Sequence, residues 1–147
     1  MVHSSYMDEV YQNIANALAR DSRIVAAYVI GSTARGEASV ESDFDLAVVV
    51  PSARSTTQDD VYELIRHVTV PRDLDLSVVD RQSSPLFLFQ IVRDGRLVYE
   101  ASQRERVAFE ACVLHAYYDT AHMRAIYARY LPERFPTNTY AHLYRSR

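Results

Sequence analysis

The sequence predicts a single α/β domain in which helices flank a small mixed sheet. Short apolar runs alternate with helical patterns along the chain, and its 147 residues are enough to bury one core. No internal repeat and no linker-like stretch divides it. We therefore expect one domain over 1–147, with a core over about 4–131 and a C-terminal tail over 132–147.

The first half of the chain predicts a helix, a strand, a short turn and a second strand. Apolar residues recur at helical spacing over 4–20. The run 23–30 is almost wholly apolar, as is typical of a central strand that is covered on both faces. A short helical turn is expected over 33–37, and the second strand over 43–50 ends at Pro51.

The second half predicts helices that alternate with strands. Ser55, Thr56 and Thr57 are candidate N-caps for the first of these helices, and Ser84-Pro85 is typical of an N-cap and the first helical residue of the next. The expected elements are a helix over 61–68, a strand over 72–79, a helix over 86–92 and a short edge strand over 96–99.

The longest helical pattern covers 103–130. An apolar stripe steps along it by threes and fours, through Val107, Ala111, Leu114, Tyr118, Ala121 and Ala125. We expect one continuous helix with this stripe as its apolar face, ended by Pro132 and Pro136.

Composition narrows the class of partner. The net charge of −3 offers no basic surface for a nucleic-acid backbone, so we predict no direct nucleic-acid binding. The single cysteine, Cys112, cannot form an internal disulfide. No secretory pattern and no run of membrane-spanning length is present, which predicts a cytoplasmic protein without a membrane partner.

The pair Gly31-Ser32 and the acids Asp43 and Asp45 are the most informative residues of the chain. They lie between two apolar runs, so two extended segments meet at a turn of small residues. Alternate residues of a strand point to the same side, and Asp43 and Asp45 therefore share a face. Two carboxylates beside backbone N–H groups suit a divalent cation that is bound together with a polyphosphate.

A third carboxylate is expected from the acid–aliphatic strand further along the chain. Asp75 is the preferred candidate because it lies between Leu74 and Leu76, well inside that strand. Asp73 points to the same face two residues earlier and competes for the role. Arg35 is a candidate charge partner for phosphate.

These residue types match the requirements of nucleotidyl transfer. A hydroxyl attacks the α-phosphorus of a nucleoside triphosphate, and two Mg²⁺ ions can stabilise the attacking and the leaving oxygen. The sequence predicts catalytic and metal-binding roles for Asp43, Asp45 and Asp75, and phosphate-binding roles for Gly31, Ser32 and Arg35.

The same residues resemble a known family. The segment Gly31–Leu46 is similar to the signature of the minimal nucleotidyltransferases, small members of the DNA polymerase β-like superfamily. Leu74–Val79 is similar to the family's third-carboxylate strand, and Pro85–Tyr99 is similar to the helix–Gly–strand segment that follows it. The resemblance covers about residues 1–131 and implies the polymerase-β-like fold.

More narrowly, the chain resembles the MNT antitoxins, which are encoded beside HEPN-domain ribonuclease toxins. This resemblance implies ATP as substrate, Mg²⁺ as cofactor, and transfer of AMP to a tyrosine of the HEPN toxin within a hetero-oligomer. A tyrosine hydroxyl has a pKa of about 10, so it needs a base or a metal to become a nucleophile. Asp75 is the candidate for that task, while Asp43 and Asp45 would hold both ions.

Two other functions stay open at this point. A small-molecule nucleotidyltransferase of the aminoglycoside-modifying type would use the same three acids, although such enzymes usually carry more sequence to bind the acceptor. A binding-only antitoxin would block its toxin sterically, through the long helix and the tyrosine-rich tail.

Overall fold

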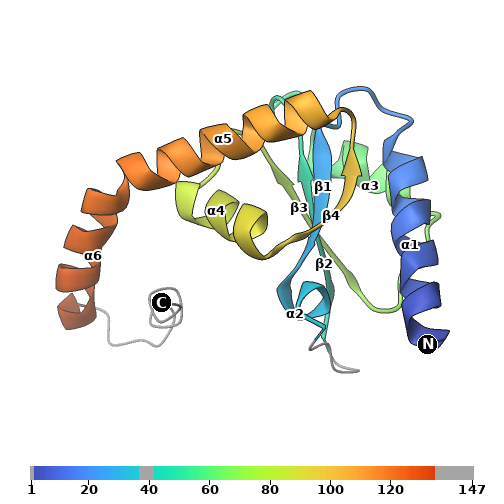
Figure 1. Ribbon diagram of the computed structural model, residues 1–147, viewed down its shortest axis with the longest axis horizontal. Coiled ribbons are helices and arrows are strands. Elements are labelled where there is room, and N and C mark those ends of the chain that lie inside the picture. The colour runs from blue at the N-terminus through green and yellow to red at the C-terminus, as the bar shows by residue number, and fades with distance from the viewer. Residues whose placement is uncertain (1, 37–41, 135–147) are drawn as a thin grey trace.

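The computed structural model describes residues 2–36 and 42–134. They form a four-stranded mixed sheet flanked by helices, which confirms the predicted fold class (Figure 1). The elements are α1 (Val2–Leu18), β1 (Ala26–Ile30), α2 (Gly31–Ala34), β2 (Phe44–Val49), α3 (Gln58–Ile65), β3 (Leu74–Val79), α4 (Pro85–Asp94), β4 (Arg96–Glu100), α5 (Gln103–Asp119) and α6 (Ala121–Arg134).

The strand order is β3-β2-β1-β4. The strand β1 pairs antiparallel with both β2 and β4, whereas β2 and β3 run parallel. The parallel pair is joined through α3, as a parallel connection requires a crossover. The two central strands are buried almost throughout, and Asp45 is the one polar residue within them.

Helices cover both faces of the sheet. Leu46 and Val48 of β2 pack with residues of α1 and α3 on one face, whereas Ala47 and Val49 pack with residues of α4 and α5 on the other. Side chains of β2 alternate in this way because successive strand residues point to opposite faces. No helix in the described ranges is both long and apolar enough to cross a membrane.

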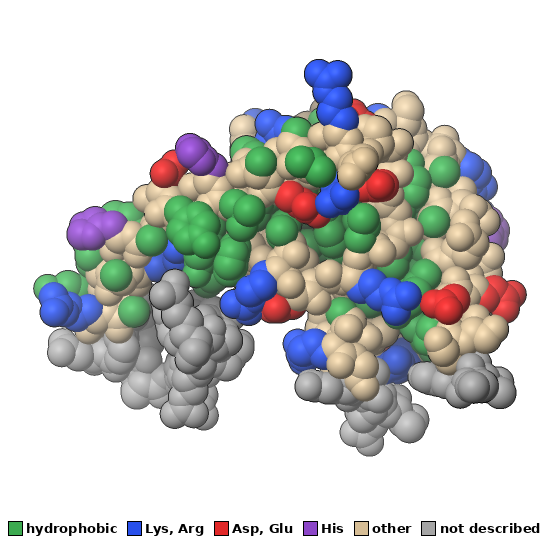
Figure 2. All heavy atoms as spheres, in the orientation of Figure 1, with side chains coloured by type: hydrophobic (Ala, Val, Ile, Leu, Met, Phe, Trp, Pro, Cys, Tyr) green, Lys and Arg blue, Asp and Glu red, His purple; other side chains and the backbone are tan. Residues whose placement is uncertain are grey.

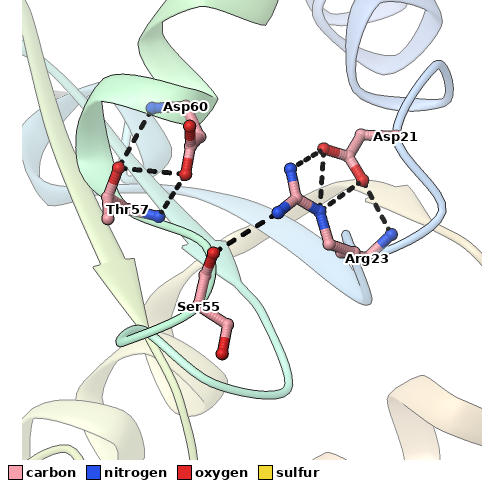
Figure 3. Close-up of polar contacts among 5 residues, drawn as sticks. All are labelled: Asp21, Arg23, Ser55, Thr57 and Asp60. Carbon is pink, nitrogen blue, oxygen red and sulfur yellow. Dashed lines mark hydrogen bonds and ion pairs between the residues drawn. The ribbon is translucent and has the colours of Figure 1, made fainter.

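The first strand starts at Ala26, three residues later than predicted, because polar contacts hold the preceding residues in a turn. The Arg23 backbone N–H donates to Asp21 Oδ1 at 2.9 Å, and its guanidinium bonds the same carboxylate at 2.7 Å (Figure 3). The Arg23 guanidinium also donates to the Ser55 carbonyl oxygen at 3.4 Å. Nearby, Thr57 and Asp60 form a capping box that starts α3, so Thr57 is the N-cap among the three candidates.

The predicted continuous C-terminal helix is wrong, because Thr120 divides it into α5 and α6. The Thr120 hydroxyl donates to the Ala116 carbonyl oxygen at 2.8 Å, and its backbone angles (φ −93°, ψ 2°) leave the helical region. A threonine that bonds back to the preceding turn bends a helix in this way. Pro132 does not end the helix either: α6 continues to Arg134, and Pro136 lies outside the described residues.

The face that α5 buries is not the predicted stripe. Phe109 and Val113 are the buried residues of this helix, whereas Val107 and Tyr118 of the stripe are 48% and 64% exposed. The Tyr28 hydroxyl of β1 donates a hydrogen bond to Glu110 Oε1 of α5 at 2.7 Å. This bond turns the side of α5 that carries Glu110 toward the sheet. Arg106, bonded to Glu110 at 3.0 Å, keeps that carboxylate paired beside the sheet.

The carboxylate of Asp80, in the loop after β3, stabilises the fold through hydrogen bonds to backbone N–H groups. Asp80 is 9% exposed, and its carboxylate accepts hydrogen bonds of 2.8 Å from the backbone N–H groups of Ala53 and Gln82. These bonds hold the pKa of Asp80 below its ordinary value, and the Ala53 bond is the largest cause. The stabilisation is therefore complete above about pH 4, the unfolded pKa, and is lost as the pH falls through the lower folded value.

We expect Asp80→Asn to lower the free energy of unfolding at pH 7 by about 1–3 kcal/mol, because the amide presents a donor to one of these N–H groups. Urea unfolding at pH 7 and below pH 4 measures the loss and its disappearance in acid. The exposed Asp59→Asn variant is the control, with a change of about 0.5 kcal/mol or less. Equal losses in the two variants would contradict the assignment.

Candidate active site

Two acids lie side by side on the parallel strands. Asp45 of β2 is in register with Asp75 of β3, and paired residues of neighbouring strands point to the same face of a sheet about 4.8 Å apart. Asp43 precedes β2 and, two residues before Asp45, falls on that same face. The Phe44 backbone N–H donates to the Asp73 carbonyl oxygen at 2.8 Å, which fixes the entrances of both strands together.

The electrostatics of Asp45 reflect this crowding. Partial burial raises the pKa of its carboxyl group, and the negative charges of Asp75 and then Asp43 raise it further. Asp73 is not among the causes, which favours Asp75 over Asp73 as the acid nearest to Asp45. Asp43 and Asp75 are exposed, so the acids open to solvent on one side. A divalent cation would offset the mutual repulsion of such a group.

The turn between β1 and β2 lies directly against Asp45. Gly31 has φ +72°, and a Cβ atom added to it would overlap Asp45 Oδ2. The antiparallel pairing of Ile30 with Asp45 brings the two together, because Gly31 directly follows Ile30. Gly31 and Ser32 open the four-residue helix α2, which begins two residues earlier than the predicted turn. Backbone and carboxylate thus approach each other as closely as only a glycine permits.

Thr33 is a residue that sequence reasoning passed over. Its hydroxyl oxygen is buried and, within the part of the chain that the structure describes, it is the one such side-chain atom without a hydrogen-bond partner. Buried hydroxyls are nearly always bonded, so this orphan beside Ser32 is unusual. No sequence signal distinguishes it, because threonine is ordinary in a turn.

Arg35 lies at the C-cap of α2 and is exposed. The pKa of Asp94, at the end of α4, is lowered mainly by the hydrogen bond from Arg93. The positive charge of Arg35 lowers this pKa further. The predicted role of Arg35 as a charge partner for phosphate stays a prediction.

The acids are better suited to a metal ion that also binds the substrate than to a metal ion held by protein ligands alone. Over residues 2–36 and 42–134, no three side chains of Asp, Glu, His or Cys lie close enough together to enclose an ion. Mg²⁺ characteristically uses one or two carboxylates and completes its shell with water and substrate phosphates. Asp45 and Asp75, with Asp43 nearby, supply that kind of donor set.

One hollow, with a volume of about 430 Å³, lies elsewhere, between α1 and α3. It is lined by residues such as Asn13 and His67, and α1 and α3 cover the face of the sheet opposite to Asp45. The acids therefore do not line this hollow.

Comparisons with known proteins identify a family and similar folds. The family described as polymerase beta, nucleotidyltransferase, matches residues 12–104. No curated protein gives a significant match.

Several solved structures of similar fold are toxin–antitoxin complexes. A toxin–antitoxin complex with AMP-PNP matches with a TM-score of 0.62 and 23% identity over 82% of this chain and 98% of that one. A tri-AMPylated HEPN toxin of Shewanella oneidensis in complex with its MNT antitoxin matches with a TM-score of 0.59 and 21% identity, over 84% and 98%. A mutant complex in which two aspartates spaced i, i+2 are replaced by glutamate gives 0.64 and 21%, over 82% and 98%.

Proposed function

The chain belongs to the polymerase beta nucleotidyltransferase family, and from that premise we propose that it transfers AMP from ATP to a tyrosine of a HEPN-type toxin and thereby acts as its antitoxin. The observation that carries the proposal is the register of Asp45 with Asp75 beneath the Gly31 turn. The proposal is supported by carboxylates that lie beside a glycine turn whose backbone N–H groups are suited to phosphate.

Each residue of this surface has a defined task in the proposed reaction. Asp43 and Asp45 would hold Mg²⁺, which supplies charge stabilisation for the attacking and leaving oxygens when it is bound. Ser32 donates its hydroxyl, and the backbone N–H groups of the turn add donors, to the triphosphate oxygens. The missing side chain of Gly31 lets the Asp45 carboxylate lie directly against the turn.

Asp75 would handle the acceptor proton. The tyrosine hydroxyl oxygen forms the new bond to the α-phosphorus, the bond from that phosphorus to the β-phosphate oxygen breaks, and pyrophosphate leaves. The proton of the hydroxyl moves to a carboxylate oxygen of Asp75, whose exposure lets it reach an acceptor outside the fold.

The choice of a protein acceptor is supported by the relatives. One similar structure contains a HEPN toxin that carries three AMP groups and is bound to an MNT antitoxin, and another contains AMP-PNP. A complex of this chain with such a toxin would be a hetero-oligomer. The open position of Asp43 and Asp75 suits an acceptor too large to enter a cavity.

The transfer is tested with the purified chain and the HEPN-type protein encoded by its neighbouring gene. Incubation with ATP and Mg²⁺ is expected to raise the mass of that protein by one or more AMP units on tyrosine, and EDTA is expected to prevent it. Transfer to a panel of small hydroxyl compounds instead would favour a small-molecule enzyme. Neutralisation of the toxin without any mass change would favour a binding-only antitoxin.

A further inference from the structure

Exposed apolar side chains concentrate on the last two helices. Among the described residues, seven of the ten exposed large hydrophobic side chains belong to α5 and α6. Figure 2 shows hydrophobic groups gathered below α5 and along α6. Tyr118 closes α5 with 64% of its surface exposed, and on α6 Met123, Ile126, Tyr127 and Tyr130 are 48%, 38%, 52% and 62% exposed. We call these five residues the outer face.

The angle at which α6 leaves α5 is held by a stack of rings and guanidinium groups. The Phe89 ring of α4 stacks on Tyr117 of α5 with centroids 3.7 Å apart. The Arg124 guanidinium of α6 lies 3.6 Å over Tyr117, and that of Arg93 lies 5.5 Å over Phe89. The Tyr117 ring thus contacts both Phe89 of α4 and Arg124 of α6, and these contacts join α6 to α4. Their arrangement orients α6.

The outer face and the acids lie on the same side of the sheet. Asp45 belongs to the face of β2 that carries Ala47 and Val49, and these residues pack with α4 and α5. In Figure 1, α5 and α6 form an arch over α4, and α2 lies at the lower end of the sheet, away from the end where α5 begins. A protein held along the arch can therefore reach the acids without crossing the sheet.

The helix α6 has the composition of a contact surface. Isolated helices of 14 residues are marginal in water, so α6 depends on packing for its stability. Residues 121–130 contain tyrosine, isoleucine, methionine and two arginines, and no acid and no lysine. Protein interfaces are enriched in Tyr, Met and Arg and depleted in Lys, Glu and Asp. The exposed Arg129 matches a partner that carries a carboxylate beside its apolar patch.

We infer that the outer face of α5–α6 is the docking surface for the acceptor protein of the proposed transfer. This inference rests on the proposed function. The acceptor would place an apolar patch with acidic borders on Tyr118, Ile126 and Tyr127, and the stack around Tyr117 would hold α6 so that the acceptor tyrosine reaches Asp75.

The test replaces Ile126 and Tyr127 together by aspartate. The matched control is Tyr62→Asp, because Tyr62 is 51% exposed on α3, which covers the other face of the sheet. Binding of the neighbouring-gene HEPN-type protein is measured by calorimetry, with circular dichroism and Mg²⁺-dependent ATP binding as checks on the fold. We expect the double variant to bind at least about 30-fold more weakly and the control to bind unchanged. Both should bind ATP as the parent chain does.

Two results would overturn the docking surface. One is equal acceptor affinity in the double variant and the control. The other is a dimer of the free chain that becomes monomeric in the double variant while acceptor binding persists, because the outer face would then join two copies. Failure of the transfer chemistry is separate: if the parent chain binds the acceptor and adds no AMP, the surface stands and the proposed reaction falls.

Discussion

Asp45→Asn is expected to reduce AMP transfer by at least about 1,000-fold, since the neutral amide can neither offset a cation's charge nor bind it with the same strength. The melting temperature is expected to stay the same or to rise. Burial and the charges of Asp75 and Asp43 already disfavour the ionised form of Asp45, so removing its charge relieves repulsion in the fold. Activity and stability should therefore move in opposite directions.

The control for this experiment is Asp73→Asn, an exposed acid at the entrance of the neighbouring strand. It is expected to keep most of the transfer activity, because the charges acting on Asp45 come from Asp75 and Asp43. AMP incorporation, measured by intact mass under single-turnover conditions, and thermal unfolding give the two readouts. An active Asp45→Asn protein would contradict the proposed mechanism. Full neutralisation of the toxin by an inactive one would favour the binding-only alternative.

Much of the fold could be predicted because local signals and tertiary structure agree in the first two-thirds of the chain. The apolar run that ends at Ile30 and the one that begins after Asp43 form the two central strands. The helix α4 starts at Pro85, directly after Ser84, as the Ser-Pro pair predicts. Ser84 makes no side-chain capping bond, so the proline rather than the serine explains that start. The strand order itself was not predictable from these local signals.

For the last two helices, the sequence did not predict the buried face or the break between them. Apolar residues occur around the whole circumference of 103–130, so periodicity could not tell the buried face from the exposed one. The choice depends on Tyr28, which is 82 residues away from Glu110 in sequence and bonds to it across the core. The break at Thr120 likewise depends on a side-chain bond that competes with the helix.

The residues of the candidate site could be predicted from the sequence for a different reason. Its acids and glycine are polar or small residues within apolar surroundings, and such residues stand out in a sequence. The residue types could therefore be named, whereas the Asp45–Asp75 register and the orphaned Thr33 hydroxyl required coordinates.

Gly31→Ala is expected to lower AMP transfer by about 100-fold, and it can be tested with an unusually close control. Gly31 and Gly36 have φ values of +72° and +71°, so an alanine at either position carries the same backbone strain of about 1–2 kcal/mol. Only at Gly31 would the new methyl group overlap the Asp45 carboxylate, because no residue that the structure describes lies within 4 Å of a Cβ at Gly36.

The comparison of these two alanine variants separates strain from contact. Both should lose similar stability in urea unfolding, whereas only Gly31→Ala should displace Asp45, and a displacement of about 1 Å at a reacting centre can cost 100-fold in rate. Single-turnover rates at saturating ATP measure the difference. If Gly36→Ala were as inactive as Gly31→Ala, backbone strain in the turn would explain the loss, and the close approach of Gly31 to Asp45 would have no catalytic importance.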